Sequence, residues 1–375
     1  MPDRFTPLTQ LLEEGWDQGI YTAAVALVGL KGKLLWEHAA GRVSRGPGAP
    51  AVTLDTFFDL ASLTKPLATA LAVMLLVDEG TLSLDRTLGQ ILPGAWLPPD
   101  KKPLTVQSLL THRAGLPAWR PFYQDILAAP PAERPALPAR LAAATPLEYA
   151  PETVTLYSDL GFMLLQAVVE TVSGGPLDRF CRERLYRPLG LDTLGFNPLH
   201  PTENRKPKTE NRIYAATETG LISGRNPGGE VHDENAWAAG GVAGHAGLFG
   251  RGREVFQLLS ALYRTYHREA APPLRPASVH PFLTPVAPGA RTPGFDVPNP
   301  DPAQCAAGRC FSPTSVGHLG FTGTSFWLDL KLGQMVVLLT NRVHLGRDHL
   351  DGIRAFRPRF HEAASRVLGF TEYFR

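Results

Sequence analysis

The chain has 375 residues, of which 44% are hydrophobic and 19% charged, and its formal net charge is +2 at pH 7. A chain of this length and composition can bury a sizeable core, which excludes an intrinsically disordered protein. Because acidic and basic residues nearly balance, charge gives no reason to expect nucleic acid or a membrane surface as a partner. We therefore expect a small-molecule ligand.

The three cysteines, Cys181, Cys305 and Cys310, are too few for a disulfide framework and lack the second Cys or His cluster that a zinc site needs. Free thiols are expected, with a local Cys305 to Cys310 bridge as the alternative. The N-terminus shows no signal-peptide pattern, and the longest apolar run, near Leu71–Val77, is too short to span a bilayer. The sequence as written predicts a cytoplasmic protein without a membrane segment, or a periplasmic or secreted one if a signal was removed.

The first predicted elements are a short amphipathic helix and a β-hairpin. Residues 8–16 have helical periodicity, and 22–28 and 33–43 predict two strands joined around residues 29–32. A Gly- and Pro-rich loop at 46–50 then leads to the sequence FFDLASLTKP at 57–66.

An apolar helix follows this stretch directly. Proline is tolerated in the first turn of a helix, so Pro66 indicates that the helix running to Asp78 begins close to Ser62. Gly80 ends it. Since residues 67–77 are apolar nearly all round, the helix should lie buried at the centre of the protein.

The rest of the chain alternates helical, irregular and strand patterns. In chain order, the sequence predicts helical structure over about 85–196 (with helices near 106–111, 160–172 and 177–186), an irregular polar segment at 197–230, a Gly-rich segment at 231–250, a helix near 253–267, a Pro-rich irregular segment at 272–313, strands at 320–330 and 334–340, and a helix from about 358 to 368.

Strands at both ends with helices between them predict one sheet of the α+β type, into which the helical region is inserted. We expect a single domain over 1–375, with a sheet subdomain at about 1–80 plus 230–375 and a helical subdomain at about 81–229. The ligand pocket should lie where the two parts meet.

Ser62 and Lys65 are the first candidates for catalysis. Three residues apart at the start of a helix they share a face, so the amine could take the hydroxyl proton if the site keeps the lysine neutral or relays its proton. The helix N-terminus would also favour developing negative charge. The alternative is a helix cap beside a solvated lysine, and S-x-x-K alone does not decide between them.

Two later stretches could complete such a site. Tyr157 precedes the apolar helix near residue 160, and its phenol could act as a general base, although a packed aromatic next to an N-cap would look the same. His318, Leu319 and Gly320 begin a strand, whose free edge could offer backbone N–H groups to an oxyanion. There the alternative is a plain turn into a strand.

Together these stretches resemble a known family. The motifs SLTK at 62–65, YSD at 157–159 and HLG at 318–320 stand in the order of the S-x-x-K, Y-x-N and K-T-G elements of serine β-lactamases and penicillin-binding proteins. The likeness is closer to the class C-like branch, which includes esterases, D-aminopeptidases and DD-carboxypeptidases. It extends from about residue 20 to the C-terminus through further similar stretches, at 109–117, 186–191, 231–236, 240–248 and 338–342.

The resemblance implies an antiparallel sheet with helices on both faces, a helical subdomain, and no metal or organic cofactor. It also implies that Ser62 is acylated, that Lys65 and Tyr157 move protons, and that the backbone N–H groups of Ser62 and Phe321 form the oxyanion hole.

Two residues depart from the family pattern. Asp159 stands where the family has an Asn that donates to a substrate carbonyl, and an ionised Asp can only accept. His318 replaces a permanently charged Lys, and Leu319 lacks the hydroxyl of the family Thr. Both changes favour an esterase, or a peptidase with different substrate ends, over an efficient β-lactamase.

Four further residues are weaker candidates. His112 is expected to order its loop by hydrogen bonding. His232 and His245 flank glycines and could line the pocket, but loop ordering explains them at least as well. Arg342, at the last strand, could face an anionic substrate group or could be a solvated surface residue.

The sequence therefore predicts a serine hydrolase acting on a small-molecule ester, a β-lactam or a D-amino-acid peptide through an acyl-enzyme. A DD-carboxypeptidase or β-lactamase is the alternative within enzymes, and a penicillin-binding sensor without turnover is the alternative outside them. An α/β-hydrolase is disfavoured because no G-x-S-x-G occurs. Oligomeric state is not predicted.

Overall fold

Strands from the two ends of the chain form one five-stranded antiparallel sheet. In the computed structural model, β1 (Ala23–Leu30) pairs with β2 (Lys33–Gly41) on one side and with β8 (Gln334–Thr340) on the other. The strands β7 (Ser325–Asp329) and β6 (Ser315–Leu319) complete the order β2-β1-β8-β7-β6, with β6 at an edge. The predicted pairing of the terminal strands is confirmed. The structure describes residues 3–199, 212–219, 222, 227–269, 271–285 and 290–373.

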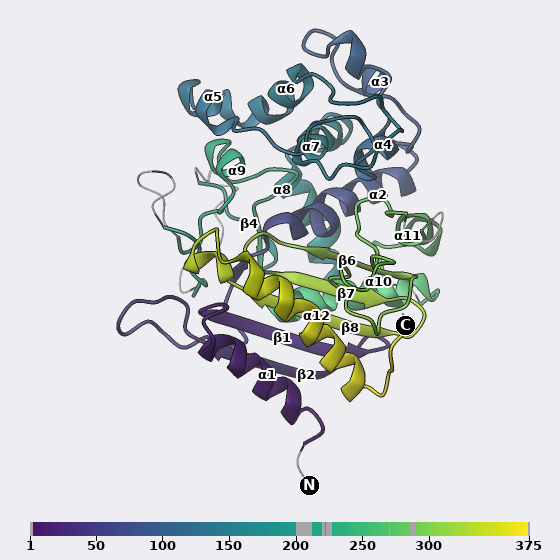
Figure 1. Cartoon of the computed structure of the whole chain (residues 1–375). Coiled ribbons are helices and arrows are strands. Elements are labelled where there is room, and N and C mark those ends of the chain that lie inside the picture. The colour runs from purple at the N-terminus through teal and green to yellow at the C-terminus, as the bar shows by residue number, and fades with distance from the viewer. Residues whose placement is uncertain are drawn as a thin grey trace.

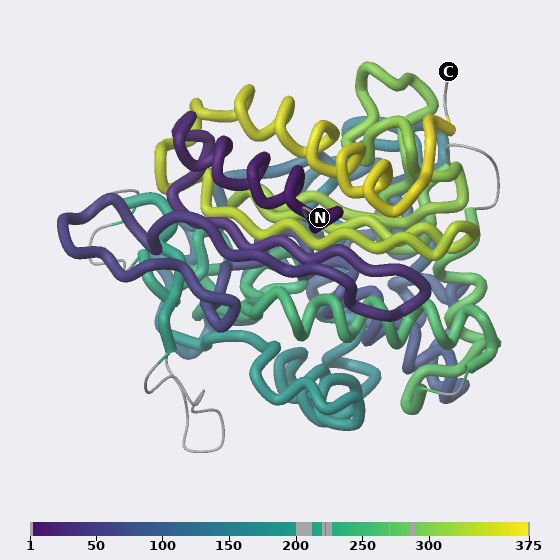
Figure 2. The backbone as a smooth tube through the Cα atoms, turned by 90° about the horizontal axis from the view of Figure 1, so that it is seen from below, coloured from purple at the N-terminus to yellow at the C-terminus, as the bar shows by residue number. Residues whose placement is uncertain are grey.

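Helices cover both faces of this sheet. The first and last helices, α1 (Thr6–Asp17) and α12 (Leu350–Val367), lie side by side on one face, and α10 (Gly252–Tyr266) lies on the other (Figure 2). Buried side chains fill the space beneath α1 and α12, among them Leu8 and Phe356. The sheet is therefore a central layer with two edge strands, β2 and β6.

The helix that follows Ser62 is buried, as its composition predicts. It runs through a 3-10 turn η1 (Ala61–Leu63), a π-helical segment η2 (Lys65–Ala70) and α2 (Leu71–Asp78). The helices of the middle of the chain lie mostly beyond α2, away from the sheet (Figure 1). Their bounds are α3 (Leu88–Ile91), α4 (Val106–Leu110), α5 (Tyr123–Ala128), α6 (Leu137–Ala144), α7 (Asp159–Ser173) and α8 (Leu177–Phe180).

A second, three-stranded sheet was not predicted. Its strands β3 (Phe58–Asp59), β5 (Leu248–Gly250) and β4 (Gly195–Phe196) are only two or three residues long, too short to show an alternating pattern. Together with α9 (Glu234–Ala238), β5 lies in the segment expected to be merely Gly-rich. This small sheet anchors the residues just before Ser62.

Several predicted boundaries were wrong. The strand predicted at 320–330 begins at Ser325, because residues 320–324 form a turn after β6. The last helix begins at Leu350 rather than at about 358, and it accommodates Pro358 in its interior. The Pro-rich stretch contains α11 (Pro276–Leu283).

The three cysteines are free and buried. Part of the predicted irregular segment 197–230 lies outside the described residues.

Candidate active site

Ser62 lies on a strained turn at the start of the buried helix. The residue before it, Ala61, adopts a left-handed backbone conformation with φ of 48°, which costs energy for any residue with a Cβ. The Ala61 N–H donates to the Asp59 carboxylate at 2.8 Å, and this bond helps to hold the turn. Such strain and a π-helical turn directly after it are both features that concentrate at functional sites.

Lys65 makes three close polar contacts although it is fully buried. Its Nζ donates to Ser62 Oγ at 3.0 Å and to the His245 carbonyl at 3.0 Å, and lies 2.7 Å from Asp159 Oδ1. Burial alone would lower the pKa of Lys65, but the Asp159 carboxylate and Tyr157 outweigh it and raise the pKa above its ordinary value. The lysine is therefore an ammonium ion at rest, and any basic role requires a relay.

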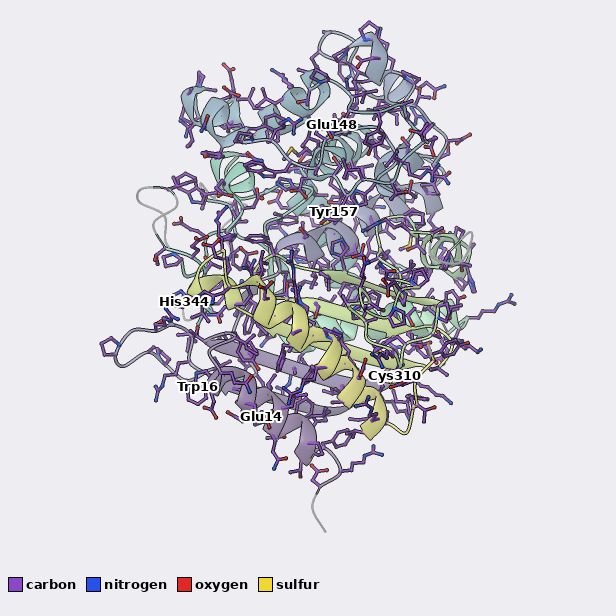
Figure 3. All side chains as sticks on the ribbon, viewed as in Figure 1. Glu14, Trp16, Glu148, Tyr157, Cys310 and His344 are labelled. Carbon is purple, nitrogen blue, oxygen red and sulfur yellow. The ribbon has the colours of Figure 1, made fainter. Side chains whose placement is uncertain are left out.

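Tyr157 stands beside both residues. It immediately precedes the N-cap of α7, where Ser158 Oγ accepts from Gly161 N at 3.3 Å. Burial raises the pKa of Tyr157, while the Lys65 cation and hydrogen bonds to Lys65 and Ser62 oppose this rise. The phenol is thus neutral at rest. Figure 3 shows Tyr157 between the helical part of the molecule and the sheet.

His112 holds the segment that carries Tyr157. Its Nδ1 accepts from Ser158 N at 3.0 Å, its carbonyl accepts from Leu156 N at 2.9 Å, and its ring centroid lies 4.6 Å from that of Tyr157. Burial and nearby cations lower the pKa of His112 well below its usual value, so it is neutral. This is the loop-ordering role that the sequence favoured.

His318 does not supply the cation that a lysine would. The Leu319 carbonyl can only accept, so Nδ1 of His318 carries the proton and donates to it at 2.9 Å. Burial lowers the pKa of His318 to about 4, although Asp296 opposes this shift. The ring lies 5.8 Å from the Tyr157 ring between centroids, and its Nε2 is buried without a hydrogen-bond partner among the described residues. His318 is therefore a neutral residue with a free acceptor.

The turn at 320–324 packs directly on the turn that carries Ser62. Thr322 Oγ1 donates to the Asp59 carbonyl at 2.8 Å, and Thr324 Oγ1 donates to the Leu60 carbonyl at 3.1 Å. Phe321 lies in this turn, and its side chain is 43% exposed. The end of β6 and the turn that carries Ser62 are thus joined, as the oxyanion-hole hypothesis requires.

Arg342 lies behind this turn rather than facing an open pocket. It follows β8, in the short 3-10 helix η8 (Arg342–Leu345), and is almost completely buried. Its Nε and Nη2 donate to the Phe321 carbonyl at 2.9 and 2.5 Å, and its guanidinium carbon lies 4.4 Å from the centre of the Phe321 ring. Its contacts hold the turn.

The two histidines of the Gly-rich segment are both engaged. His232 stacks on Phe321 with ring centroids 5.6 Å apart, and its Nε2 lies 3.0 Å from a Glu218 oxygen. The His245 carbonyl accepts a hydrogen bond from Lys65 Nζ, and the His245 Nε2 lies 2.9 Å from Asp233 Oδ1. Both border the site, His232 through its ring and His245 through its backbone.

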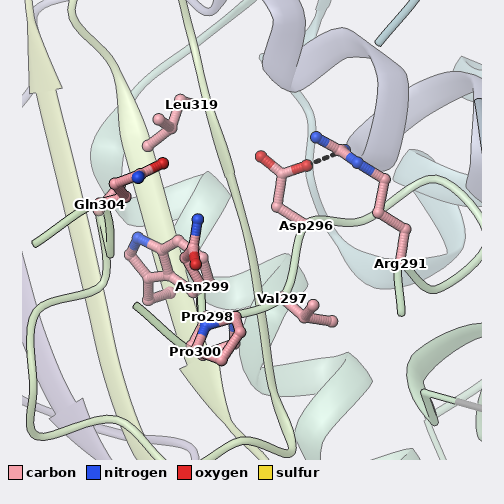
Figure 4. A pocket seen from close by; sticks show the side chains of 10 residues that line it. Arg291, Asp296, Val297, Pro298, Asn299, Pro300, Gln304 and Leu319 are labelled. Carbon is pink, nitrogen blue, oxygen red and sulfur yellow. Dashed lines mark hydrogen bonds and ion pairs between the residues drawn. The ribbon is translucent and has the colours of Figure 1, made fainter. Parts of the chain in front are cut away.

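A polar cavity of about 290 Å³ lies beside the β6 edge, with Leu319 in its wall. Arg291 and Asp296 face one another in an ion pair within its lining (Figure 4). The Arg291 guanidinium carbon also lies 5.4 Å from the centre of the Tyr157 ring. Arg291 is thus a cation on the strand side of the site, in a place where the sequence had indicated only an irregular Pro-rich segment.

Sequence reasoning missed Arg291 and Asp296, and it gave no role to Thr322 and Thr324. The two threonines follow the HLG motif directly and could have been noticed as hydroxyls on the same turn. No local signal identifies Arg291 or Asp296, because their position depends on how the 290–297 segment folds back. Asp296 pairs with Gly317 of β6 through two backbone hydrogen bonds, at 2.8 and 2.9 Å.

No cluster of metal-ligating side chains occurs within the described ranges. One described segment, Ala61–Asp78, has the length and apolar composition of a membrane span, but 83% of it is buried inside the protein. The bent pair formed by 159–173 and 177–189 is the second such candidate by composition. The first is the buried helix after Ser62, and the second consists of α7, α8 and the helical segments Cys181–Tyr186 and Arg187–Leu189 that follow α8.

The fold and this arrangement of serine, lysine and tyrosine define a protein of the β-lactamase and penicillin-binding protein type. The sequence profile of the Beta-lactamase family matches residues 8–357, and the chain belongs to this family. The predicted fold class is therefore confirmed, as is the family resemblance.

Individual relatives agree with this assignment. The chain is 31% identical over 362 residues to the Escherichia coli (strain K12) protein named "Putative D-alanyl-D-alanine carboxypeptidase", covering 91% of this chain and 83% of that one. Among solved structures, it resembles EstCE1, a hydrolase with promiscuous acyltransferase activity, with a TM-score of 0.70, 23% identity and coverage of 95% and 98%. A penicillin-binding protein homologue from Caulobacter crescentus gives a TM-score of 0.70 at 20% identity, with 98% of each chain covered. These two likenesses concern the fold.

Proposed function

We propose that this protein is a serine hydrolase that forms an acyl-enzyme on Ser62. The observation that carries the proposal is the 3.0 Å contact between Lys65 Nζ and Ser62 Oγ, made inside a buried cluster with Tyr157. A hydroxyl is a weak nucleophile until a neighbouring group takes its proton. In this cluster Lys65 and Tyr157 are such groups, and both contact the Ser62 hydroxyl.

The proton of Ser62 has a path to a carboxylate. Because Lys65 is an ammonium ion at rest, it must release a proton before it can accept one from Ser62 Oγ. Asp159 Oδ1, 2.7 Å from Nζ, can take that proton while Lys65 takes the serine proton. The net change is one proton moved from Ser62 to Asp159. The neutral phenol of Tyr157 then donates to the leaving group and is reprotonated through Lys65.

The tetrahedral intermediate needs donors aimed at its oxyanion. The backbone N–H groups of Ser62 and Phe321 are the proposed donors, and the hydroxyls of Thr322 and Thr324 hold the two turns together. Backbone donors fixed before the reaction stabilise the developing charge without reorganisation.

The neutral state of His318 bears on the substrate. A lysine in this position would attract a carboxylate, whereas His318 offers a buried acceptor at Nε2. This favours a substrate with no carboxylate next to His318, such as a neutral ester or an amide. We therefore propose an ester or amide as the substrate class, ahead of a β-lactam.

A DD-carboxypeptidase is the second candidate. Arg291, on the strand side of the site, is a cation that could receive a terminal carboxylate if its ion pair with Asp296 opened. The name of the Escherichia coli relative points the same way. A non-catalytic penicillin-binding sensor finds less support, because Ser62, Lys65 and Tyr157 are all present and in contact.

The test has two stages. A fluorophosphonate probe should label Ser62 in the wild type, and Ser62→Ala should abolish both labelling and turnover. Tyr157→Phe, which removes only the hydroxyl, should retain the fold and lose most of the rate. Hydrolysis of p-nitrophenyl esters, nitrocefin and a D-Ala-D-Ala peptide, compared side by side, then separates the candidate functions. Undiminished turnover by Ser62→Ala would refute the proposal.

A further inference from the structure

Arg357 is a buried cation for which the sequence gives no reason. It lies on α12, beneath the sheet, and its side chain is almost fully buried. No carboxylate of the described chain forms an ion pair with it, and its Nε has no hydrogen-bond partner there. Burying an uncompensated guanidinium costs several kcal/mol, so its retention calls for a role.

Among the described residues, the hydrogen bonds of Arg357 are with the turn after β6. Its Nη2 donates to the Gly320 carbonyl at 2.7 Å and to the Thr324 carbonyl at 2.8 Å. These two residues are themselves joined, since Gly320 N–H donates to the Thr324 carbonyl at 2.7 Å. One guanidinium nitrogen therefore fixes both ends of the turn.

The Gly320 carbonyl belongs to the same peptide unit as the Phe321 N–H. In a trans peptide the C=O and N–H point in opposite directions, so a donor that holds the carbonyl from behind aims the N–H forwards. The Phe321 N–H therefore points away from Arg357, and it belongs to the turn whose Thr322 and Thr324 contact the Ser62 turn. Within the described chain, the Gly320 and Gly323 N–H groups are used inside the turn, whereas that of Phe321 has no acceptor.

We propose that Arg357 is a positioning residue for the oxyanion hole, which it serves by orienting and polarising the Gly320–Phe321 peptide unit. The inference rests on the proposed acyl-serine function. A positive charge at the carbonyl end of an amide draws electron density from the nitrogen, so the N–H becomes a stronger donor. In a dry interior this effect is not screened. Burial lowers the pKa of Arg357 to about 9, which leaves it charged at neutral pH.

The test compares Arg357→Gln and Arg357→Lys with Arg359→Gln. Arg359 lies on the same helix, is 56% exposed and pairs with Glu14, so it is the matched control. Activity is measured on a p-nitrophenyl ester. It is divided by the number of active sites, which is counted by labelling Ser62 to completion with a fluorophosphonate, so that unfolded protein is left out of the comparison. We expect kcat per titrated site to fall about 100-fold in Arg357→Gln, as for the loss of one oxyanion donor, with KM within about threefold.

Arg357→Lys keeps the charge and should retain more of kcat than Arg357→Gln. The affinity for phenylboronic acid, which forms a tetrahedral anion on the serine, should fall in step with kcat. If Arg357→Gln does not fold, the Lys variant alone decides: a reduced kcat with weakened boronate binding supports the role. Full kcat per titrated site in Arg357→Gln, or in Arg357→Lys where that is the only folded variant, with wild-type boronate affinity, overturns it. Turnover in Ser62→Ala would instead refute the acyl-serine function itself.

Discussion

Lys65 Nζ and Asp159 Oδ1 form an ion pair 2.7 Å long, in which the lysine is fully buried and the aspartate 17% exposed. The family pattern has an asparagine in place of Asp159. The pair changes the resting charge of the site, because the carboxylate keeps Lys65 protonated against the effect of burial. The Asp159 carboxylate is also a proton acceptor in direct contact with Lys65 Nζ.

Asp159→Asn should therefore change the pH dependence of the reaction. Without the carboxylate, burial lowers the pKa of Lys65, but Ser62 must then give its proton to the neutral lysine. The rising limb of kcat/KM is set by Lys65 in place of the more acidic Asp159, so it should move to higher pH. Activity at pH 7 should fall by about 100-fold, within the range of general-base contributions. The measurement is a kcat/KM profile from pH 5 to 10.

Asp159→Glu is the control for this prediction, since it retains the negative charge. It should keep the wild-type shape of the profile with a smaller loss of rate. An Asn variant with an unchanged profile and rate would show that Asp159 takes no part in proton transfer.

His318→Lys should alter substrate preference. A lysine there would restore the cation that the neutral imidazole lacks, and it would favour substrates with a carboxylate. We expect the ratio of kcat/KM for a D-Ala-D-Ala peptide to that for a neutral p-nitrophenyl ester to rise about tenfold. His318→Gln, which remains neutral, should leave this ratio unchanged. If both variants shift it equally, charge is not the cause.

Buried neutral histidines should make the protein sensitive to acid. Burial lowers the pKa of His361 to about 3 and that of His318 to about 4, whereas both titrate near 6.5 when unfolded. Between these values the unfolded chain binds more protons than the folded one, so stability falls as the pH drops from about 6.5 towards 4. Each such histidine contributes a slope of about 1.4 kcal/mol per pH unit.

Urea unfolding at several pH values tests this. In His361→Gln the free energy of unfolding should depend less steeply on pH by about one histidine's contribution, whatever its absolute value. A variant curve parallel to that of the wild type would exclude His361 as a source of the acid sensitivity.

The sequence was most informative where local chemistry and pattern agree. Pro66 located the start of the buried helix, and the strand at 334–340 was predicted with its observed bounds. The contact between Ser62 and Lys65 follows from their spacing on one turn. In each case the determinants lie within a few residues of one another along the chain.

What could not be predicted depends on contacts across long distances in the sequence. Arg291 and Arg357 reach the site from segments whose own sequences indicate only an irregular stretch and a helix. The ionisation of Lys65 depends on Asp159, 94 positions later, and that of His318 on burial, which the motif does not encode. Strand limits near 320 were missed because a turn with Gly320 and Gly323 interrupts an otherwise strand-like composition.

Gly323→Ala should damage the site more than it damages the fold. Gly323 has φ of 117°, and a Cβ there would lie 2.1 Å from Thr340 Oγ1 and 2.9 Å from Arg342 Cγ. The turn that carries Phe321 would have to move. Gly80→Ala is the matched control, because Gly80 also has positive φ, at 72°, but a Cβ there meets nothing within 4 Å. It should cost only the backbone strain, about 1 kcal/mol.

Thermal unfolding and ester hydrolysis separate the two effects. We expect Gly80→Ala to retain full kcat with a slightly lower Tm, and Gly323→Ala to lose at least about tenfold in kcat at a temperature where it is still folded. The loss should appear in kcat rather than in KM, because the displaced Phe321 N–H is the proposed donor to the transition state and not to the bound substrate. Equal kcat in the two variants would mean that the position of the 320–324 turn does not limit catalysis.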